Sequence, residues 1–201
     1  MPPAISALQA RRRRILAAAT ELFVRAPYEA VQMDDIARAA QVAKPTVYRH
    51  FGTKEALFRE VVDETLAALK AEVAAIAGGS AAPHERLCAI IVMIFQRIGR
   101  LKAMLRAVEG VALRSGRVGR RAIRRELREL VGMIAGVVGD GIAQGRFVTT
   151  DPDLAARMIL GGVRMAADSD HHDPAGAMAE LFLRGLQPRD ADHAKLERSA
   201  A

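Results

Sequence analysis

Residues 33–58, MDDIARAAQVAKPTVYRHFGTKEALF, contain two short helical patterns separated by a break, and this stretch decides the fold. The first pattern is apolar on one face, which is typical of a short helix that packs against its neighbours. Pro45 suits the first turn of the second helix, because its missing N–H is not needed there. Val47 and Phe51 are expected to face inward, which leaves the polar side chains between them on the outer surface.

The composition favours an all-α protein that is long enough to bury a substantial core. The chain has 201 residues, few aromatic residues and no tryptophan, and no segment shows sustained strand-like alternation. The net charge of +7 favours a polyanion as partner without identifying one.

Cys88 is the single cysteine, so an internal disulfide and a metal cage made only of cysteines are excluded. We expect its thiol to be buried in an apolar helix. No N-terminal signal pattern is present, and the longest apolar run, residues 87–95, is far shorter than the roughly 20 residues that a membrane helix requires. These observations predict a soluble, cytoplasmic protein.

Helical patterns continue on both sides of the deciding stretch. They run over residues 11–25, 54–77 and 83–97, over a basic segment that ends at Gly145, and onward from Pro152 and from Pro174. Residues 1–10 are expected to form a loose arm, and Gly119 is expected in a loop. The arginines at positions 11–14 have the wrong sign for a helix N-terminus, so we expect either a nearby phosphate backbone or a solvated charge run.

Helix starts are marked unevenly along the chain. Thr53 is a plausible N-cap, and Asp151 and Asp173 each precede a proline in the manner of a strong start signal. By contrast, Gln32 and Ala43 are poor caps for the two helices of the deciding stretch. Glycines 161 and 162 each cost about 1 kcal/mol relative to alanine inside a helix, which suggests a close helix contact or space for a ligand.

With these elements placed, the chain resembles the TetR/AcrR family of bacterial transcriptional regulators. The resemblance is strong over the first 60 residues and rests on helix order beyond residue 80. It is carried by ILAAATELF and by Asp35, Ile36, Ala37, Ala40, Val42, Thr46, Val47, Tyr48, Phe51, Lys54, Glu55 and Leu57. Gln32, Gln41 and Ala43 depart from the family pattern, which usually has Ser or Thr at the first and last of these positions and glycine at Gln41.

The resemblance implies an all-α fold of about nine helices. Residues 1–53 would be a three-helix DNA-binding domain with a helix-turn-helix, residues 54–188 a ligand-binding and dimerisation bundle, and residues 189–201 a disordered tail. Two subunits would present their recognition helices to successive major grooves of double-stranded DNA, so a pseudo-palindromic operator is expected.

The same resemblance implies which side chains meet DNA. Lys44, Thr46 and Arg49 are expected at base edges or nearby phosphates, and Tyr48, His50 and Lys54 at phosphates. For His50 the alternative is a helix-terminal histidine satisfied by the helix dipole.

Pairing through the last two helices would make a homodimer. Its expected interface residues are Leu154, Met158, Gly161, Gly162, Met178, Leu181 and Phe182. A small effector would bind the second domain and release the protein, as a repressor, from DNA. The expected pocket residues are Ile91, Met93, Phe95, Met104, Leu105 and Met165, although each is also compatible with ordinary core. Arg97 and Arg100 suggest an effector with an apolar body and an acidic group.

Two other classes of function remain as alternatives. In an enzyme, His171, His172 and Asp173 could bind a metal, but adjacent loop residues rarely form a cage, and Asp173 is more simply a helix cap. No nucleophile motif, paired catalytic carboxylates or phosphate-binding loop is present in the sequence, so no enzyme, metal or cofactor is predicted. A helical ligand-binding dimer without a DNA-binding role is the second alternative, and the intact stretch from Thr46 to Lys54 argues against it.

Overall fold

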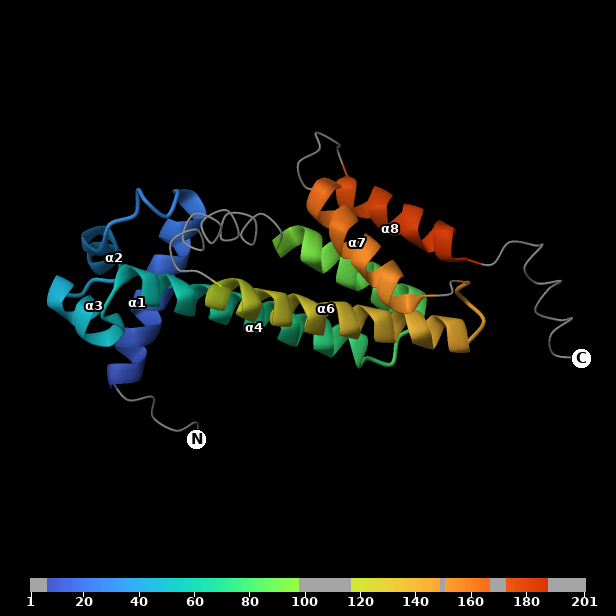
Figure 1. Ribbon diagram of the computed structural model, residues 1–201, viewed down its shortest axis with the longest axis horizontal. Helices are drawn as coiled ribbons and strands as arrows, with labels where there is room; N and C mark the ends of the chain where they lie inside the picture. The colour runs from blue at the N-terminus through green and yellow to red at the C-terminus, as the bar shows by residue number, and fades with distance from the viewer. Residues whose placement is uncertain (1–6, 98–116, 149–150, 167–172, 188–201) are drawn as a thin grey trace, which may run out of the picture. The chain divides into compact units, whose positions relative to one another are not determined.

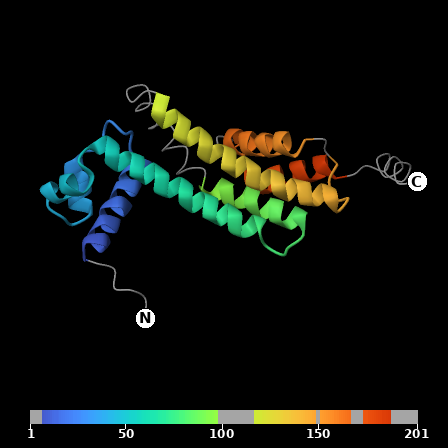
Figure 2. The same ribbon diagram turned by 60° about the horizontal axis from the view of Figure 1, so that its bottom comes forward.

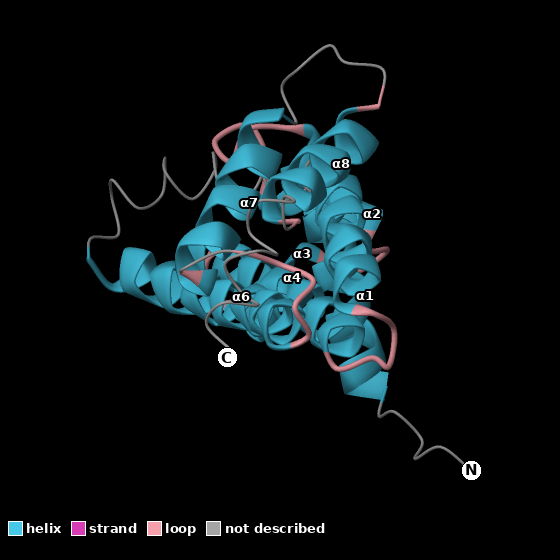
Figure 3. Cartoon of the chain, turned by 90° about the vertical axis from the view of Figure 1, so that its right-hand side faces the viewer, coloured by secondary structure: helices cyan, strands magenta, loops and turns pink. Residues whose placement is uncertain are grey.

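The computed structural model describes residues 7–97, 117–148, 151–166 and 173–187 (Figure 1). All regular elements within these ranges are α-helices, as Figure 3 shows by colour. The predicted all-α fold class is therefore confirmed. The described residues hold eight helices, compared with about nine expected for the whole chain.

The chain divides into two compact units, and the division falls inside a helix. The first unit ends at Ala67, within α4 (Lys54–Ala77), and also takes in the start of α6 (Arg117–Ala143). The second unit begins at Ala68. The predicted boundary before Lys54 lies at the start of the same helix, and it stays a prediction.

In the first unit, α1 (Ala7–Arg25), α2 (Met33–Ala39) and α3 (Lys44–Phe51) pack together with the first part of α4. The expectation of a loose arm up to residue 10 is wrong at its end, because α1 begins at Ala7. The alanine, leucine and glutamine residues before the arginines all favour helix.

Three aromatic side chains form the centre of this first unit. The ring of Phe58 lies edge-on to Phe23, with centroids 4.8 Å apart, and to Tyr28, with centroids 5.0 Å apart. All three side chains are buried. Phe23 comes from α1, Tyr28 from the following loop and Phe58 from α4. Their contacts therefore hold α1 against the first part of α4.

The second unit is built around the helical residues 83–97, which pack with the later part of α4, α6, α7 (Pro152–Ala166) and α8 (Pro174–Leu186). Cys88 is half-buried, so the expected buried thiol is only partly enclosed. Gly119 lies inside α6, contrary to its expected place in a loop. The core of this unit includes the buried side chains of Val73, Leu87, Ile90, Ile94, Leu130, Ile134, Val138, Ile159 and Val163.

The predicted N-caps are confirmed by their hydrogen bonds. Thr53 Oγ1 accepts from the N–H of Ala56 at 3.1 Å, and Asp151 Oδ1 accepts from the N–H of Leu154 at 3.0 Å. Asp173 Oδ1 accepts from the N–H of Gly176 at 2.9 Å. Each cap satisfies a backbone donor that the first turn of a helix leaves unpaired.

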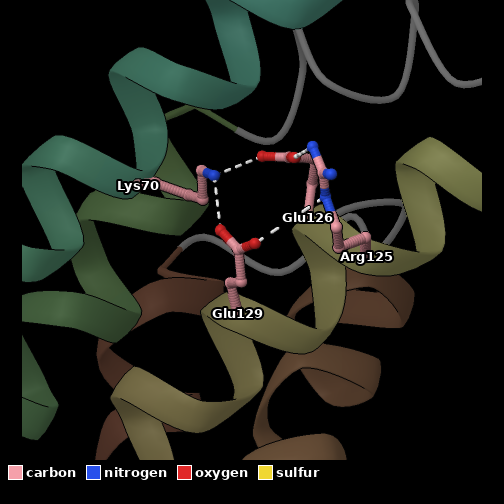
Figure 4. A network of polar contacts seen from close by, with 4 residues as sticks. All are labelled: Lys70, Arg125, Glu126 and Glu129. Carbon is pink, nitrogen blue, oxygen red and sulfur yellow. Dashed lines mark hydrogen bonds and ion pairs between the residues drawn. The ribbon is translucent and has the colours of Figure 1, made fainter.

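A charged network joins α4 to α6 within the second unit. Lys70 of α4 donates a hydrogen bond of 2.6 Å to Glu129 and also pairs with Glu126, while Arg125 contacts the same two carboxylates (Figure 4). The hydrogen bond from Lys70 lowers the pKa of Glu126, and its bonds to Glu126 and Glu129 raise the pKa of Lys70. Figures 1 and 2 show α6 running alongside this part of α4.

Arg86, in the helix of residues 83–97, forms a second polar link between α4 and α6. Its buried guanidinium donates to the carbonyl oxygen of Ala77, at the end of α4, and to Asp140 of α6 at 2.8 Å. A buried charge is tolerated when it is paired and hydrogen-bonded in this way. The later part of α4 is thus fixed to the second unit by side chains as well as by apolar packing.

Candidate nucleic-acid interface

The two helices of the deciding stretch form as predicted, and both lack a side-chain N-cap. Neither Gln32 before α2 nor Ala43 before α3 makes a capping hydrogen bond. α3 begins at Lys44, so this residue belongs to the helix, although the following Pro45 disfavours helical geometry there. α3 ends at Phe51, and its C-cap Gly52 has a positive φ of 71° and donates to the carbonyl of Tyr48 at 2.7 Å.

The turn between α2 and α3 is closed by a residue from α1. Gln41 adopts a positive φ of 54°, and the guanidinium of Arg14 donates to the carbonyl oxygens of Ala40 and Gln41. Arg14 therefore binds the carbonyl oxygens that follow α2. Neither a phosphate contact nor a solvated charge, the two alternatives expected for residues 11–14, describes this role. Arg12 of the same run pairs with Glu60 and lies over the ring of Phe51, 5.5 Å from its centroid.

The candidate recognition surface is the outer face of α3. Val47 and Phe51 are buried, as predicted, and they anchor the helix in the first unit. Tyr48 is 43% exposed, Arg49 is exposed and Thr46 is half-buried beside them. The exposed positions combine a phenol and a guanidinium, which are suited to phosphate and base contacts.

Lys44, at the start of α3, forms an ion pair with a residue of α2. Its ammonium Nζ lies 2.7 Å from Oδ1 of Asp34 in the first turn of α2, and both side chains are 53% exposed. The hydrogen bond and the charge of Asp34 raise the pKa of Lys44. The ammonium predicted to reach DNA is therefore already engaged by a carboxylate.

His50 is half-buried at the last turn of α3, and its buried Nε2 has no hydrogen-bond partner among the described residues. Burial lowers the pKa of His50, and the nearby charges of Arg49, Arg11 and Arg12 lower it further. Both effects disfavour the charged imidazolium relative to the neutral imidazole. This result opposes the alternative in which a charged imidazolium is held by the helix dipole.

Lys54, at the start of α4, is directed toward its own unit. Its ammonium lies 4.3 Å from the centroid of the Tyr28 ring and donates to the carbonyl oxygen of Glu29 at 3.4 Å. A phosphate contact by Lys54 would have to share the ammonium with these groups. The sequence pattern predicted that a helix begins at Lys54, as it does, but it could not show that the Lys54 ammonium lies over the ring of Tyr28.

The expected pocket residues differ in their exposure to solvent, and their grouping in one pocket stays a prediction. Ile91 is fully buried, Met93 and Phe95 are half-buried, and Met104 and Leu105 lie outside the described residues. Met165 is 73% exposed on α7.

The arginines expected near the acidic group of an effector give no support to that role. Arg97 forms an ion pair with Glu72, 3.0 Å from Oε1, so it is not reserved for an acidic effector. Arg100 lies outside the described residues.

The expected pairing residues separate into two groups. Leu154, Met158, Gly161 and Leu181 are exposed on α7 and α8. Gly162 instead faces its own subunit, where an added Cβ would lie 2.9 Å from Cε of Met178 and 3.2 Å from the ring of Phe182. The close helix contact predicted from the paired glycines is thus the α7–α8 contact inside one subunit, and it removes Gly162 and the buried Met178 from the exposed surface.

The alternative metal site receives no support. His171 and His172 lie outside the described residues, and Asp173 serves as the N-cap of α8. Within the described ranges, no group of three or more histidine, cysteine, aspartate or glutamate side chains could hold a metal ion. The helices in these ranges also fall short of the length and apolarity needed to cross a membrane.

Comparison with known proteins connects this geometry to a family. Residues 15–61 match the model of the family described as bacterial regulatory proteins, tetR family. A transcriptional regulator of the helix-turn-helix type from Bacillus subtilis, YhgD, is 28% identical over 150 residues, which are 75% of this chain and 78% of that protein.

Two regulators from Mycolicibacterium smegmatis match shorter regions. The transcriptional repressor KstR is 39% identical over 79 residues, 38% of each chain. The transcriptional activator FasR is 46% identical over 52 residues, 26% of this chain and 24% of that protein.

A solved structure shares the fold. The transcriptional regulator FadR from Bacillus subtilis, determined in complex with stearoyl-CoA, superimposes with a TM-score of 0.68 at 24% identity, covering 88% of this chain and all of that one. The relatives are regulators rather than enzymes. The family match on α1 to α4, the related regulators and the shared fold together support a transcriptional regulator of the TetR/AcrR family.

Proposed function

We propose that this protein is a ligand-responsive repressor that binds a pseudo-palindromic operator as a homodimer. The observation that carries the proposal is the outer face of α3, where Tyr48 and Arg49 are exposed while Val47 and Phe51 hold the helix in the core. An α-helix fits the major groove of B-DNA, where arginine and lysine recognise guanine and where hydroxyl groups contact bases or phosphates.

The side chains of α3 divide by their position on the helix. Lys44 and Thr46 lie in the first turn and Arg49 one turn later, so these three are assigned to base edges or nearby phosphates. Tyr48, His50 and Lys54 are assigned to phosphates. Lys54 reaches a phosphate by leaving the ring of Tyr28, and the charge of Arg49 contributes to both kinds of contact.

The dimer is assigned to the exposed apolar side chains of α7 and α8. Leu154, Met158 and Met165 repeat at helical spacing on α7, and Leu181 is exposed on α8. A stripe of large apolar side chains left open to water is typical of an interaction surface. In a two-fold symmetric pair the same stripe would meet its own copy, which explains why neither helix covers it within the subunit.

The effector is assigned to the second unit as a small molecule with an apolar body. FadR, which shares the fold, binds stearoyl-CoA, whose long acyl chain has that character. An effector changes DNA binding only if its affinity differs between the DNA-binding state and the other state. Release from DNA on effector binding is proposed here, with KstR as a repressor of related sequence.

The DNA-binding part is tested by footprinting on the DNA that flanks the protein's own gene. We expect two protected half-sites related by two-fold symmetry. Arg49→Ala should weaken binding about tenfold, because a base or phosphate contact is lost from the groove. Arg25→Ala is the matched control, since it removes the same charge from an exposed position at the end of α1 and should change affinity little. Equal effects of the two variants contradict the role of α3.

The dimer is tested by sedimentation velocity. Leu181→Glu should convert a dimer to a monomer, because it places a charge in an apolar contact. Leu8→Glu introduces the same change at an exposed leucine of α1, 59% accessible, and should leave the dimer intact. A Leu181→Glu protein that sediments as a dimer places the interface elsewhere.

The direction of regulation is tested with a transcription assay on the footprinted promoter. The proposal expects less transcript when the protein is added and recovery when stearate or stearoyl-CoA is added. A rise in transcript on adding the protein would show an activator, as FasR is named. DNA binding that is unchanged by either compound would exclude them as effectors.

A further inference from the structure

The ion pair between Lys44 and Asp34 connects the first turns of α3 and α2. α3 carries most of the proposed DNA contacts and α2 precedes it, and the ammonium and carboxylate are 2.7 Å apart. α3 has neither a side-chain N-cap nor an acidic residue in its first turn, so a lysine there meets the unfavourable end of the helix dipole. Asp34 offsets that cost, and it stands in the first turn of α2, where the dipole favours an acid.

The pair changes what Lys44 offers to DNA. An unpaired lysine attracts any phosphate, whatever the sequence, because its charge alone supplies the attraction. Beside Asp34 much of that charge is cancelled locally, and a phosphate placed on Lys44 is repelled by the carboxylate. Two donors of the ammonium remain available after the hydrogen bond to Asp34. A neutral acceptor such as guanine O6 or N7 accepts from them without the repulsion that an anion meets.

We propose that Asp34 is a specificity-determining residue, which restrains Lys44 so that this lysine contributes to binding at guanine-bearing sites and contributes little to non-specific phosphate attraction. The inference rests on the proposed DNA-binding role of α3. The inference assigns a role in DNA recognition to Asp34 of α2. Its carboxylate acts through Lys44 and does not need to contact DNA.

Asp35 provides a matched control one residue further along. It lies in the same turn of α2, but its carboxylate pairs with Arg38 of its own helix at 3.1 Å and not with a residue of α3. Asp34→Asn and Asp35→Asn therefore change the net charge of the protein equally. Any difference between their effects on DNA binding reports the release of Lys44.

The experiment measures binding of the full chain to two duplexes of about 30 base pairs. One has random sequence, and the other is selected by the wild-type protein from a random library. On the random duplex, Asp34→Asn should bind about two to five times more tightly than Asp35→Asn, as for loss of an exposed ion pair, with a salt dependence steeper by about one unit of slope. On the selected duplex the two variants should differ less, so only Asp34→Asn lowers the preference for the selected sequence.

The same two aspartate substitutions are also made in a protein that lacks the Lys44 ammonium. This second pair shows whether a difference between the aspartate variants comes from Lys44 or from a change in folding. In a Lys44→Gln background, the Asp34→Asn and Asp35→Asn changes should become equivalent on both duplexes, because no ammonium remains to be released. Circular dichroism is recorded on each protein to check that it keeps its helical content.

Equal effects of the two aspartate variants in the wild-type background overturn the inference, as does a difference that persists with Gln at position 44. Failure of the wild-type protein to bind either duplex contradicts the proposed function itself. The two failures are therefore distinguishable.

Discussion

The guanidinium of Arg14 donates two hydrogen bonds to the carbonyl oxygen of Ala40, at 3.2 Å from Nε and 2.8 Å from Nη2. The last turn of α2 is already closed by backbone hydrogen bonds from Gln41 to Arg38 and from Val42 to Ala37, and α1 adds a charged donor to the carbonyl that follows. Arg14→Met should lower the free energy of unfolding by about 1–2 kcal/mol, since carbonyl acceptors lose a charged donor. Arg13→Met removes the same charge from an exposed neighbour and should cost less than about 0.5 kcal/mol. Urea unfolding of both variants checks the difference, and equal losses contradict it.

The turn that Arg14 covers carries backbone strain at Gln41. Its φ of 54° lies in the left-handed region, which costs a residue with a side chain about 1 kcal/mol and which glycine adopts freely. Gln41→Gly should therefore raise the melting temperature, while Gln41→Ala should not. A drop in the melting temperature of Gln41→Gly would show that the side chain of Gln41, rather than its backbone, determines stability here.

Gly141 and Gly139 of α6 should respond oppositely to the same substitution. A Cβ at Gly141 would overlap the buried ring of Phe147, whereas a Cβ at Gly139 meets nothing within 4 Å. Gly141→Ala should therefore destabilise the protein by about 1–3 kcal/mol through overpacking. Gly139→Ala should stabilise it by about 0.5–1 kcal/mol, because alanine favours helix. Calorimetric unfolding measures both, and a stabilised Gly141→Ala protein contradicts the packing described for Phe147.

The stability of the first unit should depend on pH through His50. Burial and the charges of Arg49, Arg11 and Arg12 lower its folded pKa below the ordinary 6.5, so the unfolded chain binds the proton more readily. The stability that the neutral imidazole contributes is complete above pH 6.5 and is lost as the pH falls through the folded pKa. An NMR titration of the His50 ring should give a midpoint below 6.5, which Arg49→Gln moves upward. A midpoint at or above 6.5 in the wild-type protein contradicts this account.

Local patterns predicted the helices and several of their caps, because the information lies within a few residues. The spacing of Val47 and Phe51 is sufficient to orient α3, and an aspartate before a proline is sufficient to place a helix start, as at Asp151. The exposed positions of α3 follow from the same spacing. These features do not depend on which other part of the chain is nearby.

Contacts between distant residues could not be predicted in this way. Arg14 and Ala40 are 26 positions apart, and nothing in the arginine run distinguishes Arg14 from its neighbours. Gly161 and Gly162 are adjacent and identical in type, yet only Gly162 packs against Met178, because that contact depends on where α8 lies. The pairing of Lys44 with Asp34 likewise depends on the angle between α2 and α3, and sequence spacing does not determine that angle.

We propose above all that two copies of α3 read two-fold symmetric DNA. Its most direct test is the selection of bound sequences from a random duplex library by the wild-type protein. We expect an inverted repeat whose half-sites are about one helical turn apart, and we expect the Arg49→Ala protein not to enrich it. Enrichment of a single unrepeated motif, or of the same repeat by the Arg49→Ala protein, would contradict it.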